Sequence, residues 1–196
     1  MKKIFYFLMM SLVLVVFTAC QKEEHHEKQV NIVEYFDYKC PYCKVFDQKI
    51  MKEIEKKYET DRIQYQLIDV AFLGDDAIEG ARAAQAVQIV APQQFMTFHH
   101  HLIEQQPNHE GKWLTHDKID QQIDRLSIST EQKDKIKKEY KTENSEAWKR
   151  AEKDIIRANN DKVKLVPTLK INGEEVSDPL NKDEVFKKID DALKAQ

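Results

Sequence analysis

The feature that most constrains the fold of this chain is Cys40-Pro41-Tyr42-Cys43, which places two cysteines three positions apart. An apolar run over residues 30–36 precedes the motif, and residues 44–58 follow it with the apolar spacing of a helix. A strand, a Cys-x-x-Cys motif and a helix in this order are typical of a thioredoxin-like redox site. The sequence therefore predicts an α/β protein with a thioredoxin fold and a reactive dithiol.

The predicted helix gives the two cysteines different positions. We expect Cys40 where the helix begins, because unpaired backbone N–H groups and the positive end of the helix dipole favour a thiolate there. Cys43 shares a helical face with Phe46, Ile50 and Ile54, and this apolar face is expected to pack on the core. The pattern predicts an accessible Cys40 that attacks a partner and a buried Cys43 that resolves the product.

Cysteine content and charge limit the other functions of the chain. It has 3 cysteines, and Cys20 belongs to the N-terminal segment, so the remaining close pair cannot form a structural disulfide framework. The net charge of −3 gives no strongly basic surface for nucleic acid and no strong charge for an anionic membrane. We therefore expect no nucleic-acid partner.

The N-terminal segment resembles an export signal. Two lysines precede an uncharged apolar run over residues 4–17, which is too short to span a membrane comfortably. The run ends in Phe-Thr-Ala before Cys20, which resembles a bacterial lipobox with its lipid-modified cysteine. We predict a lipoprotein signal peptide over 1–19 and a flexible tether over 20–29. A plain cleaved signal or an uncleaved anchor are alternatives, and each places the folded part outside the cytoplasm.

Glu34 is a second candidate site residue. It shares one face of the predicted first strand with Val30, Ile32 and Phe36, and so interrupts an apolar surface. Two interpretations remain open. Glu34 is either a paired carboxylate at a strand edge, or a buried acid with a raised pKa that helps to move protons at Cys43.

The rest of the chain predicts an interrupted thioredoxin fold. Residues 30–74 include a second strand and form its first part, whereas 75–160 have helical patterns throughout and no convincing strand. We interpret 75–160 as an all-helical insertion, long enough to bury a small core of its own. Residues 161–196 are expected to complete the fold with a hairpin at Asn172-Gly173 and a closing amphipathic helix.

Two further motifs lie in these later regions. Pro167 falls within the predicted strand over 165–171, where a proline requires an edge, a bulge or a cis peptide bond. His99-His100-His101 lies within a predicted helix, where consecutive side chains point about 100° apart and cannot converge on one ion by themselves. We interpret these histidines as partly exposed helix residues and predict no metal site.

The ordered combination of these motifs resembles the DsbA family, and the lipobox and tether are similar to its Gram-positive lipoprotein members. The resemblance covers residue 30 to the C-terminus. It implies a thioredoxin fold with an inserted helical domain. It also implies that Cys40 is the nucleophile, Cys43 its resolving partner, and Pro167 a cis-proline that faces the disulfide. Glu34 matches the buried acid of many members.

The same resemblance implies where substrates bind. Val166 precedes the expected cis-proline and is the position that tunes reactivity in the family. With Pro41 and Tyr42, it is expected to contact the substrate. Tyr42 stands where the best-known strong oxidants have histidine, which leaves the strength of oxidation open.

The implied activity is the oxidation of reduced, unfolded exported proteins by a monomer that needs no cofactor and is held at the cell membrane by its lipid. The re-oxidant is either a quinone-linked membrane partner or a small-molecule oxidant. A disulfide reductase or isomerase is the alternative within redox chemistry. A zinc site with only two cysteine ligands and a binding module on a thioredoxin scaffold are the non-redox alternatives.

Overall fold

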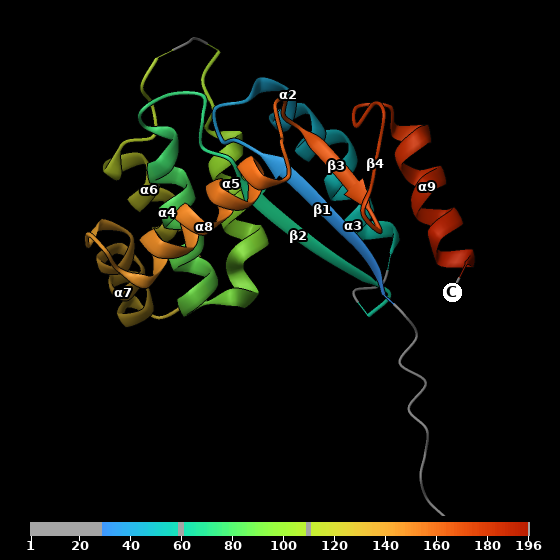
Figure 1. The fold of residues 1–196 in the computed structure, drawn as a ribbon. Coiled ribbons are helices and arrows are strands. Elements are labelled where there is room, and N and C mark those ends of the chain that lie inside the picture. Colours follow the sequence, from blue (N-terminus) through green and yellow to red (C-terminus); the bar gives the residue numbers. More distant parts are fainter. Residues whose placement is uncertain (1–28, 59–60, 109–110, 196) are drawn as a thin grey trace, which may run out of the picture.

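The computed structural model describes residues 29–58, 61–108 and 111–195 (Figure 1). The predicted signal peptide, the lipidation site Cys20 and most of the predicted tether lie outside these residues. No helix in the described ranges is long and apolar enough to cross a membrane.

A mixed four-stranded sheet forms the centre of the fold. Its strands are β1 (Val30–Phe36), β2 (Ile63–Asp69), β3 (Thr168–Ile171) and β4 (Glu174–Glu175), in the order β2-β1-β3-β4. β1 runs parallel to β2 and antiparallel to β3, and β3 runs antiparallel to β4. The carboxyl end of β1 leads directly to the Cys-x-x-Cys motif (Figure 1).

β1 is one of the two inner strands, and both of its faces are buried. Ile32 and Phe36 belong to the main buried core, whereas Val33 and Tyr35 pack on the opposite face in a smaller cluster with Ala158. A strand that is buried on both sides has little freedom to shift its register, since a shift by one residue would exchange the two faces. β1 therefore fixes the start of the motif relative to the sheet.

The motif helix begins directly after Cys40, as the sequence predicts, and has three parts. These are α2 (Pro41–Phe46), the π-helical η2 (Asp47–Met51) and α3 (Lys52–Lys57). Proline at the first position is favourable because that N–H has no partner within a helix. Cys43 and the three apolar residues predicted to share its face are all at most 2% exposed, which confirms the core-facing stripe.

The described part of 75–160 contains helices and no strand. Its elements are α4 (Ala77–Val90), the 3₁₀-helix η3 (Pro92–Gln94), α5 (Phe95–Glu104), α6 (His116–Asp124), α7 (Thr130–Lys141) and α8 (Glu146–Asn160). They gather beside β2, and α9 (Lys182–Lys194) lies on the opposite side of the sheet (Figure 1). The expectation of a separate helical core is wrong, because a single buried cluster joins Ile32 of β1 to Leu102 and Tyr140.

The return to the sheet differs from the prediction at one position. Pro167 lies just before β3 rather than within it, and the Val166–Pro167 peptide bond is cis. The proline therefore takes no place in the ladder, where its missing N–H would leave a gap. Asn172 and Gly173 have φ values of 49° and 86°, the left-handed pair that a tight hairpin needs, and they join β3 to a β4 of only 2 residues.

Candidate active site

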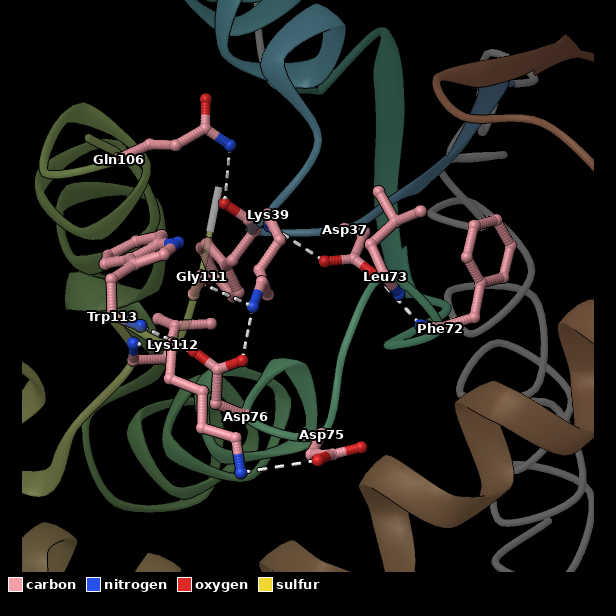
Figure 2. Close-up of polar contacts among 12 residues, drawn as sticks. Asp37, Lys39, Phe72, Leu73, Asp75, Asp76, Gln106, Gly111, Lys112 and Trp113 are labelled. Atoms are coloured by element: carbon pink, nitrogen blue, oxygen red, sulfur yellow. Dashed lines mark hydrogen bonds and ion pairs between the residues drawn. The ribbon is translucent and has the colours of Figure 1, made fainter. Parts of the chain in front are cut away.

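The loop between β1 and the motif is held by the Asp37 carboxylate. One of its oxygens accepts hydrogen bonds from the backbone N–H groups of Phe72 and Leu73, both at 2.9 Å. The other oxygen accepts the N–H of Lys39 at 2.8 Å (Figure 2). Asp37 is fully buried, so these contacts connect the segment before Cys40 to the chain that follows β2.

A second clamp connects the same loop to the helical region. The ammonium group of Lys39 pairs with Asp76 and donates to the carbonyl oxygen of Gly111 at 2.9 Å. The second Asp76 oxygen accepts the N–H groups of Trp113 and Leu114 at 2.7 and 3.0 Å (Figure 2). The loop that presents Cys40 is thus fixed to both parts of the fold.

We expect Asp76→Asn to lower the free energy of unfolding by about 1.5–3 kcal/mol, since charge-assisted hydrogen bonds contribute about that much. The neighbouring Asp75 is the matched control, because its side chain is 87% exposed and pairs only with an exposed Lys112 at 3.3 Å. Asp75→Asn is expected to change stability by less than about 0.5 kcal/mol. Urea denaturation of both variants measures the difference, and equal effects would show that the clamp does not stabilise the fold.

The structure places Cys40 at the N-cap of α2 with extended backbone angles, φ −81° and ψ 115°. Its Sγ accepts the N–H of Cys43 at 3.3 Å and donates to the carbonyl oxygen of Val166, also at 3.3 Å. Both cysteines are free thiols. The sulfur of Cys40 thus contacts a residue, Val166, that is 126 positions away in the sequence.

The expectation of an accessible Cys40 is wrong for this dithiol form. Cys40 is only 2% exposed, because the segment with Val166 and the buried Pro167 lies against its sulfur. Pro41 and Tyr42 form the outer surface of the motif instead, and Tyr42 is 62% exposed.

The pKa values of the two thiols are shifted in opposite directions. A hydrogen bond from the Cys43 thiol lowers the pKa of Cys40 most, burial opposes this effect, and the N–H groups of Cys43 and Tyr42 lower it further. Burial raises the pKa of Cys43 well above its usual value, and the hydrogen bond with Cys40 and the charges of Cys40 and Glu34 add to the rise. The first thiolate of the pair therefore forms on Cys40.

Replacing Cys43 with alanine is expected to raise the pKa of Cys40 by about 1–2 units, the equivalent of a lost hydrogen bond to a charged group. Cys43→Ser is the control, because its hydroxyl can still donate to the thiolate. Thiolate absorbance against pH, measured with Cys20 also replaced by alanine so that Cys40 is the one remaining cysteine, gives the midpoint in each variant. Identical midpoints would exclude the side-chain hydrogen bond as the cause.

Glu34 is buried rather than at an edge. It is 1% exposed and accepts a hydrogen bond from the Tyr65 hydroxyl at 2.6 Å. Burial raises the pKa of Glu34 to about 8, although the Tyr65 hydrogen bond lowers it in part. Of the two interpretations left open by the sequence, the structure favours the buried acid with a raised pKa.

The predicted site residues thus converge on one place, while several functional neighbours could not be predicted. Cys40, Cys43 and the Val166–Pro167 segment meet directly, and the charge of Glu34 acts on Cys43. The sequence alone does not predict Tyr65 or the clamp. The only signal for the clamp is a pair of charged residues just before the motif, because its partners lie in distant loops.

A Cys-x-x-Cys pair at the start of a helix, with an acidic first thiol and a cis-proline segment against its sulfur, defines a thiol:disulfide oxidoreductase with a thioredoxin fold. The comparisons identify the family. The chain belongs to the thioredoxin family, whose model, described as "Thioredoxin", matches residues 25–191.

Curated relatives and solved structures agree with this class. The chain is 30% identical to disulfide bond formation protein D of Bacillus subtilis, with 85% of this chain and 74% of the relative covered. A probable protein of the same name from Bacillus cereus is 26% identical, with 84% and 74% covered. Both matches support oxidoreductase activity.

The structural matches confirm the predicted fold. The crystal structure of oxidised BdbD from Bacillus subtilis matches with a TM-score of 0.77 and 26% identity over 88% of this chain and 90% of that one. Reduced DsbA1 from Neisseria meningitidis matches with a TM-score of 0.61 and 19% identity, covering 90% and 92%, which shows a shared fold.

Proposed function

We propose that this chain is a membrane-anchored extracytoplasmic oxidase that introduces disulfides into reduced exported proteins. The observation that carries this proposal is the contrast between the two thiols: the pKa of Cys40 is lowered, which stabilises its thiolate, whereas the pKa of the neighbouring Cys43 is raised. The names of the relatives, which describe disulfide bond formation, support the same direction of reaction.

In the proposed reaction the Cys40–Cys43 disulfide accepts two electrons. A substrate thiolate attacks Sγ of Cys40, forming a mixed disulfide and breaking the bond to Cys43, which leaves as a thiolate. A second substrate thiolate then attacks the substrate sulfur of the mixed disulfide and releases Cys40 as a thiolate. The substrate keeps the new disulfide, and the enzyme is left reduced.

Acidity at Cys40 sets the driving force. Lowering a thiol pKa by one unit stabilises the thiolate by about 1.4 kcal/mol, which corresponds to about 30 mV for a two-electron couple. Cys43 differs, because its raised pKa makes its thiolate unstable, and it therefore takes up a proton when it leaves the disulfide. We assign the delivery of this proton to Glu34, whose pKa of about 8 leaves it protonated at neutral pH.

A groove beside the motif is the proposed site for the unfolded substrate chain. It has a volume of about 810 Å³ and is lined by Pro41, Leu73 and Trp113 among other residues. Tyr42, Leu73 and Leu165 are exposed apolar side chains at 62%, 41% and 78%. Lysine and amide side chains, among them Lys44 and Gln48, share this lining, so the groove offers an extended segment hydrogen-bonding groups as well as the exposed apolar side chain of Leu73.

The location and partners follow from the N-terminal segment and the chemistry. We propose that residues 1–19 direct export and that lipid on Cys20 anchors the chain to the cell membrane. Each turnover leaves the enzyme reduced, so a quinone-linked membrane partner or a small-molecule oxidant must remove two electrons. We propose that the chain acts as a monomer.

The redox equilibrium with glutathione tests the direction of reaction. An oxidase is expected to have a potential at or above about −180 mV, the range of protein disulfide isomerase and stronger oxidants. A potential near about −270 mV, the value for thioredoxin, would instead assign the chain to disulfide reduction. The fraction of reduced protein at each glutathione ratio, measured after acid quenching and thiol alkylation, gives the value.

A further inference from the structure

Three side chains, of residue types that bind metal ions, meet on the side of the motif helix that faces the helical region. Asp47 at the start of η2 meets His99 and His100 of α5, and one potential ligand atom from each lies within 4.8 Å of the others. The side chains of Asp47 and His99 are each 1% exposed, and that of His100 is 15% exposed. The prediction that these histidines are partly exposed is therefore wrong for His99, although the three histidines do not converge by themselves.

Two polar atoms inside this cluster lack a hydrogen-bond partner among the described residues. They are Nε2 of His99 and Oδ2 of Asp47. Nε2 of His99 faces Oδ1 of Asp47 at 3.5 Å, which is too far for a good hydrogen bond. Buried polar atoms are almost always paired in folded proteins, so two unpaired atoms in one cluster are in position to bind an ion or a water molecule.

The outward nitrogens of both rings are already occupied. Nδ1 of His99 lies 3.3 Å from the Tyr38 hydroxyl, and Nε2 of His100 lies 2.9 Å from a Glu55 carboxylate oxygen. Each ring is thus oriented with its other nitrogen toward Asp47. Metal-binding histidines are held in this way, with the non-coordinating N–H bonded to a carboxylate, a carbonyl or water.

We propose that Asp47, His99 and His100 form a binding site for a divalent transition-metal ion, with Zn²⁺ as the best match. Two histidines and one carboxylate are a common three-residue ligand set for zinc, and a water molecule completes the tetrahedron. Calcium and magnesium are disfavoured because they select oxygen ligands.

The distances are compatible with this ion after one local change. Ligand atoms about 2.0–2.1 Å from a tetrahedral zinc ion lie roughly 3.3 Å apart, close to the 3.5 Å between Asp47 and His99. Nδ1 of His100 lies 2.5 Å from Asp47 in a hydrogen bond, so this pair must separate as the ion replaces the shared proton.

One nearby cation opposes binding and can be accommodated. Nζ of Lys52 lies 3.8 Å from Oδ2 of Asp47, but it also contacts Glu104 at 2.6 Å, and its side chain is 37% exposed. Lys52 can therefore remain with Glu104 when the ion enters. The bound ion would cross-link the motif helix to α5, and this role does not depend on the proposed function.

Zinc titration of the oxidised full chain with Cys20 replaced by alanine tests the site, because the Cys40–Cys43 disulfide then leaves no free thiol as a competing ligand. We expect one ion per chain by calorimetry. Replacing His99 or His100 with glutamine is expected to weaken binding by at least about 100-fold, and Glu55→Gln by about 10–100-fold. His101→Gln on the same helix and a double His25→Gln/His26→Gln variant are the controls and should bind as the parent does.

Two results would overturn the site. One is the absence of zinc binding to the oxidised parent, and the other is unchanged affinity in both the His99 and the His100 variants. Circular dichroism shows whether these variants fold. If they do not fold, Co²⁺ is added to the parent and to the control variants instead. Paramagnetic NMR shifts of two imidazole rings, present in the parent and also in the controls, support the site. Absence of these shifts in the parent refutes it.

Discussion

Cys40→Ser is expected to reduce disulfide formation in a reduced model substrate to the rate measured without enzyme. The serine hydroxyl can replace the thiol at the N-cap of α2, but it cannot form a disulfide with Cys43 or with a substrate. The fold should persist, since the change removes no large group from the core. Oxidative refolding of a reduced, denatured substrate protein, followed by recovery of its activity, measures the loss.

The matched control is Cys43→Ser, which keeps the nucleophile and removes the resolving thiol. This variant should form a mixed disulfide with glutathione or substrate and hold it, which mass spectrometry of the intact protein detects. Residual catalysis by Cys40→Ser above the uncatalysed rate would contradict the assignment of Cys40, whereas a parent protein that does not exceed the uncatalysed rate would favour a binding module on a thioredoxin scaffold.

The second large effect is expected for Glu34→Gln, which should make the protein more stable at alkaline pH. The pKa of Glu34 is raised from 4.5 to about 8 in the fold, so the native state keeps a proton that the unfolded chain loses between these values. Stability of the parent protein therefore falls as pH rises through this range and then levels off. A shift of this size corresponds to a loss of roughly 5 kcal/mol in the free energy of unfolding of the parent. The Glu34→Gln variant does not undergo this loss, because glutamine has no proton to release.

Urea denaturation at pH 4 and pH 9 gives the comparison. The two proteins should be similar in stability at pH 4, with the variant more stable at pH 9. Glu175→Gln, at an exposed position on β4, serves as the control and should show no such difference. A parent and a Glu34 variant with the same pH dependence would mean that Glu34 is not buried in solution as it is here.

Local patterns predict most of the fold because they report burial directly. The stripe of Cys43, Phe46 and Ile50 predicts the buried face of the motif helix, which the structure confirms. The π-helical turn at Asp47 was not predicted, because it changes the backbone without changing the apolar pattern. The common core was missed because periodicity within one helix does not show which element covers it.

The site is predictable only where residues lie close in sequence or belong to a known motif. The dithiol and Pro167 were located in this way, whereas the burial of Cys40 depends on a segment 126 residues away. Tyr65 and Asp76 act through hydrogen bonds to residues distant in the sequence, and such contacts leave no periodic signal. The pairing of Asp47 with two histidines likewise depends on how α5 packs against the motif helix.

The position of the covering segment also affects how the chain matures. Because synthesis proceeds from the N-terminus, both thiols are made well before Val166 and Pro167. Until those residues arrive, nothing from their segment shields the sulfur of Cys40. The growing chain therefore passes through a stage in which its two thiols are accessible to any thiol or disulfide nearby. This stage ends only when the last third of the chain has been made and its covering segment has packed against Cys40.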